Sequence, residues 1–304
     1  IIMLHIARKF FRGHNLLVAA AGVVIAANAG GAFSPIGDVT TIMLWIAGKF
    51  SALEVIAGAI LPSITIGTVS YLLLSKKINN DNPDDTPETE STGAFSLGKK
   101  IIIASAGVSF LLPMIFKLIH LPPVLGILTG LGITWMLVDL VEHNGKRESR
   151  LAARMESLIQ KIDMASIKFF IGILLAVSAL SALGVLDVLS GIIYGADQET
   201  SRVIVGNVIL GALSSILDNI PLTAITIDIL DVADTSLWVL LAICVGTGGS
   251  LLSIGSAAGV VAMGLVKELS FKKYFQIAFV PALVSFLAGI AVWLVQWQVV
   301  THLV

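Results

Sequence analysis

Eight long apolar runs constrain the fold of this chain more than any other feature of its sequence. They cover residues 16–46, 53–74, 101–119, 124–141, 167–189, 203–229, 237–266 and 274–295. A helix needs about 20 apolar residues to cross the hydrocarbon core of a bilayer. The chain is 56% hydrophobic and 13% charged, whereas a soluble domain is about 45–50% apolar and about 25% charged. The sequence therefore predicts an all-α membrane protein that crosses the bilayer several times.

Composition also excludes several other classes of protein. The net charge of −1 offers no basic surface for a nucleic acid. The single cysteine, Cys244, rules out an intrachain disulfide and a cysteine-based transition-metal cluster, and we interpret it as a small packing residue. No phosphate loop or nucleophile–base arrangement is readable, so we expect no cofactor and no enzyme. The chain begins at Ile1 without a signal peptide, and we expect it to be a fragment or a processed product.

The basic residues predict the orientation of the spans. Lysine and arginine cluster in four segments, at 8–12, 76–100, 146–161 and 267–273. When all four are placed in the cytoplasm, run 203–229 must enter and leave on the outer side as a re-entrant hairpin. We expect two polar connections as well, a solvated loop over 79–93 and a charged surface helix over 142–161.

Two of the long runs are interrupted by related glycine-rich sequences. Residues 30–37 and 248–255 share a Gly-Gly pair and a later Ile-Gly pair, and they align without a gap at an offset of 218. Broken helices in inverted repeats are typical of secondary transporters. The alternative is a packing face of small residues. The residues expected to break helices are Gly30, Gly31, Pro35, Gly37, Pro221, Gly248, Gly249 and Gly255.

Asp38 directly follows the first break and lies inside an apolar run. An ionised side chain at membrane depth is costly, which makes it a functional hypothesis by default. Its neighbours supply neutral oxygens that suit a hard cation such as Na⁺ or Li⁺; they are Asn28, Ser34, Thr40 and Thr41. A second interpretation, compatible with the first, makes Asp38 the N-cap of the half-helix that follows.

The run 203–229 carries the polar sequence Asp-Asn-Ile-Pro in its middle. Because Pro221 cannot sit inside a regular helix, we expect the chain to turn there. Ser214, Asp218 and Asn219 would then gather at the tip of a hairpin at membrane depth. The alternative is a soluble loop between two short helices. In the second break, Ser250, Ser253 and Ser256 supply hydroxyls without a carboxylate.

These motifs resemble those of NhaD-type sodium/proton antiporters. The resemblance rests on Asn-Ala-Gly-Gly-Ala-Phe-Ser-Pro-Ile-Gly-Asp-Val-Thr-Thr at 28–41, Ser-Ser-Ile-Leu-Asp-Asn-Ile-Pro-Leu-Thr at 214–223, and Gly-Thr-Gly-Gly-Ser-Leu-Leu-Ser-Ile-Gly-Ser at 246–256. It implies two inverted repeats with broken transmembrane helices and re-entrant hairpins, and exchange of Na⁺ or Li⁺ for H⁺. The first hairpin of such a fold would come before Ile1. The functional positions carried over are Asn28, Asp38, Thr40, Thr41, Ser214, Asp218, Asn219, Ser253 and Ser256.

The resulting expectation is a sodium/proton exchanger working by alternating access, in a bacterial inner membrane. Its partners are the bilayer, Na⁺ or Li⁺, and H⁺, with a homodimer left open. The alternatives are an arsenite or organic-anion carrier of the same superfamily, or a channel. We divide the chain into the end of a first repeat (1–74), a cytoplasmic loop (75–98), scaffold helices with a basic loop (99–165) and a second repeat (166–304).

Overall fold

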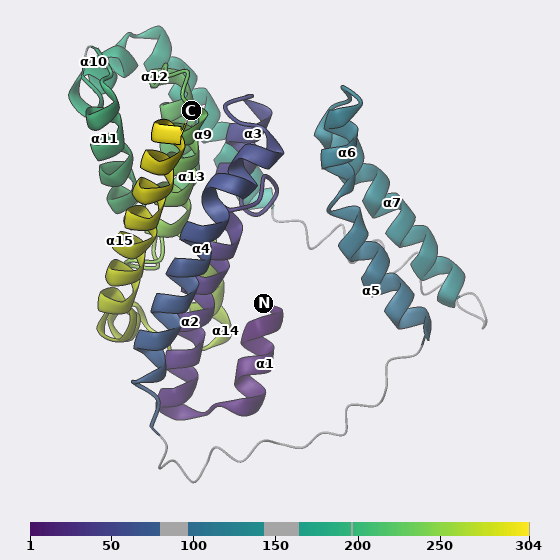
Figure 1. The fold of residues 1–304 in the computed structure, drawn as a ribbon. Coiled ribbons are helices and arrows are strands. Elements are labelled where there is room, and N and C mark those ends of the chain that lie inside the picture. Colours follow the sequence, from purple (N-terminus) through teal and green to yellow (C-terminus); the bar gives the residue numbers. More distant parts are fainter. Residues whose placement is uncertain (80–96, 143–163, 196, 304) are drawn as a thin grey trace. The chain divides into compact units, whose positions relative to one another are not determined.

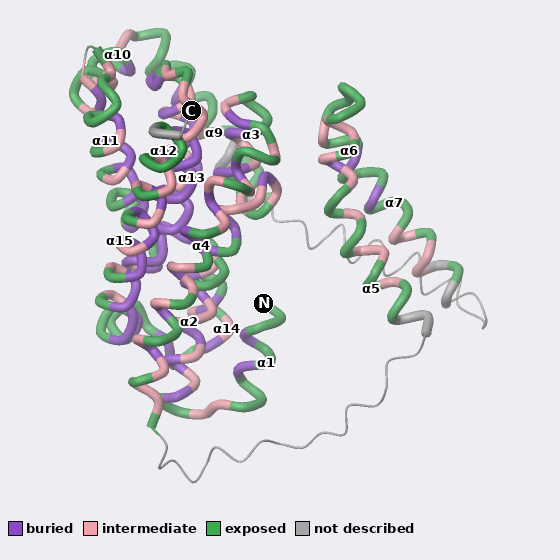
Figure 2. The backbone as a smooth tube through the Cα atoms, in the orientation of Figure 1, coloured by how far each residue is buried: buried purple, intermediate pink, exposed green. Residues whose placement is uncertain are grey.

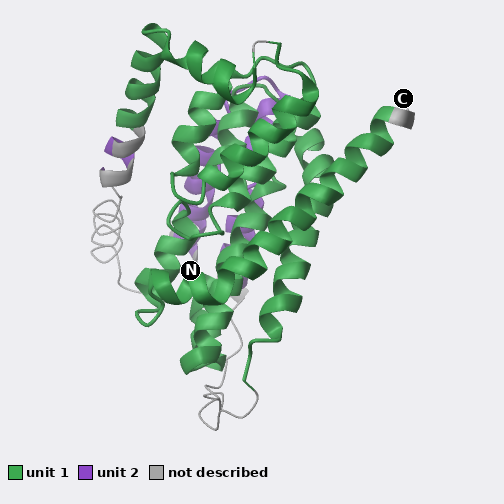
Figure 3. Cartoon of the chain, turned by 90° about the vertical axis from the view of Figure 1, so that its left-hand side faces the viewer, with its two compact units in different colours: residues 1–88, 170–304 green, residues 89–169 purple. Residues whose placement is uncertain are grey.

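A computed structural model describes residues 1–79, 97–142, 164–195 and 197–303 (Figure 1). The chain divides into two compact units, one of residues 1–88 and 170–304 and one of residues 89–169 (Figure 3). The elements of the described part are helices, and four of them are long and apolar enough to cross a membrane, with a fifth if one bent pair counts as a single span. The protein is a multi-pass integral membrane protein of the all-α class.

The larger unit contains both of the interrupted runs. Its helices are α1 (Ile2–Phe10), α2 (Gly13–Ala32), α3 (Val39–Ile46), α4 (Ala52–Ser75), most of α9 (Met164–Ala182), α10 (Val185–Ile193), α11 (Thr200–Leu213), α12 (Asn219–Ile229), α13 (Thr235–Gly248), α14 (Ala257–Leu265) and α15 (Phe271–Leu303). Helix α13 forms the core of this unit, because every residue from Leu237 to Gly248 is buried (Figure 2). Around it pack α2, α4, α11 and α15.

The contact between α11 and α13 explains two of the glycines. A Cβ atom on Gly211 would lie 2.7 Å from the carbonyl oxygen of Cys244, and one on Gly248 would overlap the carbonyl of Gly211. Small residues let two helix backbones approach this closely in a membrane protein. Cys244 is buried at this contact, so it contributes a small side chain to a crowded interface.

The two interrupted runs fold into matching triplets of helices. Helix α2 is followed by a break and then α3 and α4; helix α13 is followed by a break and then α14 and α15. The half-helices α3 and α14 begin at Val39 and Ala257, which keeps the offset of 218 seen in the sequence. In Figure 1, α2 leads up to α3 and α4 returns downward, whereas α13 leads down to α14 and α15 returns upward. The triplets are therefore inverted relative to each other.

Helices α11 and α12 form the hairpin that the sequence predicts over 203–229. Its two ends meet, because Gln198, just before α11, donates a side-chain hydrogen bond of 3.0 Å to the carbonyl of Ile229, the last residue of α12. The chain turns at residues 214–218, slightly before the predicted position. Pro221 lies in the first turn of α12, where a proline is tolerated because its missing N–H would have had no helical partner.

The smaller unit is a helical pair with one interruption. Its helices are α5 (Leu97–Ser109), α6 (Leu112–Leu118) and α7 (Pro123–Glu142). Helix α7 packs on both α5 and α6, and Ser109 donates a hydrogen bond of 3.0 Å to the carbonyl of Gly130. The predicted span over 101–119 is confirmed as a candidate span over Lys100–Leu118, with a short interruption at Phe110 and Leu111.

Two further expectations differ from the structure in detail, and two others fall almost wholly outside the described residues. The run 167–189 is bent by 90° between α9 and α10, at Gly184, whose φ of 69° lies in the left-handed region that glycine adopts readily. The last span continues to Leu303. The surface helix expected over 142–161 and the loop over 79–93 lie outside the described residues, apart from their first residues.

Candidate cation-binding site

Asp38 caps the half-helix that begins after the first break. Its Oδ1 atom accepts a hydrogen bond of 2.7 Å from the backbone N–H of Thr41, and its own N–H donates to the Thr41 hydroxyl at 3.3 Å. This reciprocal pair is a capping box, and an N-cap of this kind stabilises a helix by about 1 kcal/mol. The capping interpretation of Asp38 is thus confirmed, and both hydrogen bonds that Thr41 donates to the carboxylate go to Oδ1.

The second carboxylate oxygen of Asp38 lies against helix α13. A Cβ atom on Gly246 would stand 2.8 Å from Oδ2 of Asp38, so the carboxylate rests directly over the backbone at this glycine. Sequence reasoning did not single out Gly246. The signal was the extra glycine two positions before the Gly-Gly pair of the second break.

The second break repeats the geometry of the first, with a hydroxyl in place of the carboxylate. Ser256 caps α14 by accepting a hydrogen bond from the N–H of Gly259, at positions equivalent to Asp38 and Thr41. A Cβ on Gly249 would lie 2.8 Å from the carbonyl oxygen of Gly255, and the equivalent Cβ on Gly31 would lie 3.3 Å from that of Gly37. In both breaks the loop therefore folds back onto the end of the preceding helix; a Cβ would collide at Gly249 and would be tightly packed at Gly31.

Asn28 joins the two breaks. From the last turns of α2, its side-chain amide donates to the hydroxyls of Ser250 and Ser256, each at 2.8 Å. Tyr274 supports the same region from α15, because its fully buried hydroxyl donates a hydrogen bond of 2.6 Å to the carbonyl of Ser250. The sequence analysis did not predict a role for Tyr274. The one available signal is that a tyrosine hydroxyl in an apolar run needs a hydrogen-bond partner when it is buried.

The turn between α11 and α12 is hydrogen-bonded to the end of α13 and to the second break. Ser214 donates to the carbonyl of Val245 at 2.8 Å, and Ser215 accepts the N–H of Gly255 at 3.2 Å. Asp218 caps α12 by accepting the N–H of Ile220 at 3.1 Å. The turn therefore belongs to the same core as the breaks.

Two hydroxyls of the predicted set are buried without a hydrogen-bond partner. These are Oγ1 of Thr40, next to the capping carboxylate, and Oγ of Ser253, in the second break. A buried polar group left unpaired costs about 1–3 kcal/mol. Ser253 also has a φ of 65°, a conformation that is uncommon for residues other than glycine and often marks a functional position.

The structure thus gathers some of the predicted residues and not others. Asn28 lies with Ser256, and Ser214 lies beside the second break. Ser34 stays within the first break, where it accepts the N–H of Ile36 at 3.5 Å. Asn219 lies in the first turn of α12, which packs on α3. Within the described residues, no hydrogen bond joins Asp38 to Asn219 or Ser253, so a direct contact between them stays a prediction.

Comparison with known proteins places this arrangement in a family. The sequence model of the family described as citrate transporter (CitMHS) matches residues 1–246. The chain belongs to the CitMHS family. Sodium/proton antiporter 1 of Arabidopsis thaliana is 38% identical over 301 residues, which are 97% of this chain and 51% of the plant protein. Sodium/proton antiporter 2 of the same plant is 38% identical over 280 residues, 90% of this chain and 65% of that protein.

A bacterial relative shows the same likeness. The Na⁺/H⁺ antiporter NhaD of Vibrio cholerae is 34% identical over 271 residues, which are 81% of this chain and 55% of that protein. The resemblance to NhaD-type antiporters is therefore confirmed for this member of CitMHS, whereas an enzyme is not supported. The chain spans about half to two thirds of the length of these relatives. No solved structure matches the chain significantly.

Proposed function

We propose that the protein containing this CitMHS chain exchanges Na⁺ for H⁺ across its membrane by alternating access. The observation that carries the proposal is the set of oxygens at the two breaks: the carboxylate of Asp38, with Oγ1 of Thr40 and Oγ of Ser253, which are buried without a hydrogen-bond partner. Oxygen atoms without sulfur or imidazole suit a hard monovalent cation. The names of the plant and bacterial relatives agree with this cargo.

The chemistry of the site favours a cation over an organic anion. Neither 28–41 nor 246–259 contains a lysine or an arginine, and a carboxylate such as Asp38 would repel an anion. An organic-anion carrier would need positive side chains, or half-helix N-termini left free to face the substrate. Here the N-termini of α3 and α14 are capped by Asp38 and Ser256. The citrate in the family's description is therefore not the cargo that we propose.

In the proposed mechanism, one carboxylate binds either a proton or Na⁺. The two ligands compete for Asp38, and each weakens the binding of the other by the same factor at equilibrium. Thr40, Thr41 and Ser253 supply neutral oxygens, whereas Asp218 has an ancillary role. We propose the same supporting role for Asn28, Ser34, Ser214, Asn219 and Ser256.

The test is Na⁺-dependent proton flux in vesicles that contain the full-length protein. Asp38→Asn keeps an oxygen that can still accept the N–H of Thr41, and removes the titrating charge. It should abolish exchange while the protein remains folded in the membrane. Normal flux in a well-expressed Asp38→Asn variant would overturn the assignment and shift it to Asp218.

We also propose an inverted topology, Li⁺ as a second cargo, a homodimer and a bacterial inner membrane location. Cysteines placed in 79–93 and near Asp234 should be labelled from opposite faces of the membrane; labelling from one face would contradict the inverted topology. Li⁺ as a second cargo is tested by Li⁺-dependent flux, and a homodimer by the mass of the solubilised protein. A bacterial inner membrane location is tested by fractionation, which matters because relatives also occur in a plant.

A further inference from the structure

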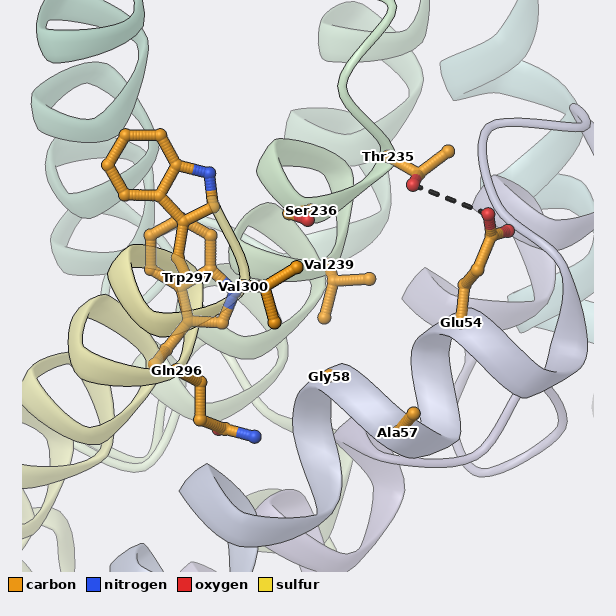
Figure 4. Close-up of a pocket in the computed structure, with 10 residues that line it drawn as sticks. Glu54, Ala57, Gly58, Thr235, Ser236, Val239, Gln296, Trp297 and Val300 are labelled. Atoms are coloured by element: carbon orange, nitrogen blue, oxygen red, sulfur yellow. Dashed lines mark hydrogen bonds between the residues drawn. The ribbon is translucent and has the colours of Figure 1, made fainter. Parts of the chain in front are cut away.

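A cavity separate from both breaks lies where the first turns of α4 and α13 meet the last turns of α15 (Figure 4). Its volume is about 280 Å³. Its walls are mostly apolar and include Gly58, Val239 and the ring of Trp297, and its polar groups are Glu54, Thr235, Ser236 and Gln296. None of the ten residues that line it carries a positive charge, so the only formal charge on its wall is the carboxylate of Glu54.

Two hydrogen-bond acceptors of this cavity have a weak donor or none. Glu54 accepts the N–H of Ser51 through Oε2 at 2.6 Å, whereas its Oε1 receives only a long hydrogen bond of 3.4 Å from Thr235, drawn in Figure 4. On the opposite wall, Oε1 of Gln296 is buried and has no hydrogen-bond partner. The cavity therefore offers acceptors to a ligand that can donate hydrogen bonds.

The other repeat shows what occupies the equivalent position. The sequences of α4 and α15 align at an offset of 219 residues, and this alignment pairs the one proline inside each helix, Pro62 with Pro281. At the far end of this helix pair, the ammonium group of Lys77 donates a hydrogen bond of 2.6 Å to the carbonyl of Ile277. The positions equivalent to Lys77 and Ile277 are Gln296 and Gly58, which both line the cavity.

At one end of the pair of α4 and α15, the ammonium group of Lys77 thus fills the space between the helices. At the other end, Gln296 stands in place of the lysine and the space remains as the cavity. The charge nearby is reversed as well, because Glu54 corresponds to Lys273. Aromatic rings complete the open end: Trp293 and Trp297 stack with centroids 6.0 Å apart, and Trp297 is held by its hydrogen bond of 3.1 Å to Asp234. A tryptophan ring offers a ligand a large and rigid apolar surface.

We propose that this cavity binds a small organic ammonium ion, such as a short primary alkylammonium. Its charged group pairs with Glu54, and its apolar part lies against Trp297 and Val239. A volume of about 280 Å³ is at the small end for ligand pockets, which fits a chain of a few carbons. Bare Na⁺ is a poorer match, because the oxygens stand on opposite walls and the surface between them is apolar.

The test uses the full-length protein in lipid nanodiscs, with n-butylammonium as the probe and 1-butanol as its neutral counterpart. Tryptophan fluorescence and calorimetry should both show saturable binding of butylammonium and none of butanol. Glu54→Gln should weaken binding by about tenfold or more, since it removes a charge-assisted hydrogen bond. Glutamine can still complete the capping box with Ser51, so the variant should fold. Asp231→Asn is the matched control, because Asp231 is an exposed carboxylate outside the cavity.

Three results would each overturn the proposal. Equal binding of butanol would show a groove that takes hydrocarbon, displacement of butylammonium by an equal concentration of Na⁺ would show an alkali-ion site, and unchanged affinity in Glu54→Gln would remove its charged partner. The proposal is independent of the exchange mechanism. Binding should persist in Asp38→Asn, so failure of the exchange assignment would not remove it.

Discussion

Replacing Gly246 by alanine should disturb the proposed exchange site with little change to the fold. The added methyl group would stand 2.8 Å from Oδ2 of Asp38 and 3.6 Å from Cβ of Ala32. The contact with Ala32 is an ordinary van der Waals contact, whereas the contact with Oδ2 of Asp38 is too close. The carboxylate must retreat by about 0.6 Å to reach a normal van der Waals separation. Because Thr41 holds Oδ1 at 2.7 Å, the retreat must weaken the cap or rotate the carboxylate.

Two opposing effects set the change in stability. Alanine in a helix interior is favoured over glycine by about 1 kcal/mol, and overpacking costs about 1–3 kcal/mol. The net change in the free energy of unfolding should therefore be within about 2 kcal/mol. The effect on ion binding should be larger, because the displaced carboxylate is the charged ligand of the cation, and a hydrogen bond or contact to a charged group contributes about 1.5–3 kcal/mol. We expect the apparent Na⁺ affinity to fall by about ten- to a hundredfold.

The assay is Na⁺-dependent proton flux in proteoliposomes, with thermal stability measured with and without Na⁺. Gly30→Ala is the matched control, since it adds a methyl group to α2 where no atom lies within 4 Å. Gly30→Ala should keep the wild-type Na⁺ dependence. If Gly246→Ala kept it too, the contact between α13 and the carboxylate would have no part in binding, and the reasoning would fail.

Four other substitutions test the remaining contacts. Thr40→Ala and Ser253→Ala each remove a buried hydroxyl without a partner. In the absence of Na⁺, the free energy of unfolding should stay the same or rise by up to about 1–3 kcal/mol, while the stabilisation by added Na⁺ should become smaller. A fall in both the free energy of unfolding without Na⁺ and the stabilisation by Na⁺ would contradict the ligand role. Tyr274→Phe should lower the free energy of unfolding by about 1 kcal/mol and weaken Na⁺ dependence, as seen by denaturation and flux. Asn28→Ala uncouples the two breaks, so flux should drop well below wild type in protein that still inserts; unchanged flux would show that the bond to Ser256 is dispensable.

The sequence predicted the parts of the fold that depend on local chemistry. Each Gly-Gly pair lies where its helix ends, α2 at Ala32 and α13 at Gly248, and the returning loop packs closely on Gly31 and Gly249. The N-cap role of Asp38 follows from an acidic residue placed before an apolar run. The hairpin was predictable from a polar Asp-Asn-Ile-Pro sequence between apolar flanks. Each of these signals lies within a few residues of the feature that it specifies.

Long-range contacts could not be predicted in the same way. Nothing near Gly246 in the sequence says that it faces Asp38, about two hundred residues away, because that depends on how the two triplets pack. The bond from Tyr274 to Ser250 is of the same kind. The bend at Gly184 was missed because an apolar run of that length reads as one span, and hydropathy does not record backbone dihedral angles.

The difference between the two breaks bears on the proposed mechanism more than their likeness does. Asp38 and Ser256 occupy equivalent N-cap positions, so the inverted repeat supplies the same geometry twice but only one carboxylate. A bound proton or a bound Na⁺ neutralises that carboxylate equally, whereas the empty site keeps a negative charge within apolar surroundings, where charge is costly. Both loaded states are therefore easier to move through the protein than the empty one. A carrier that rarely reorients with its site empty exchanges one ligand for the other and does not carry either ligand across the membrane alone.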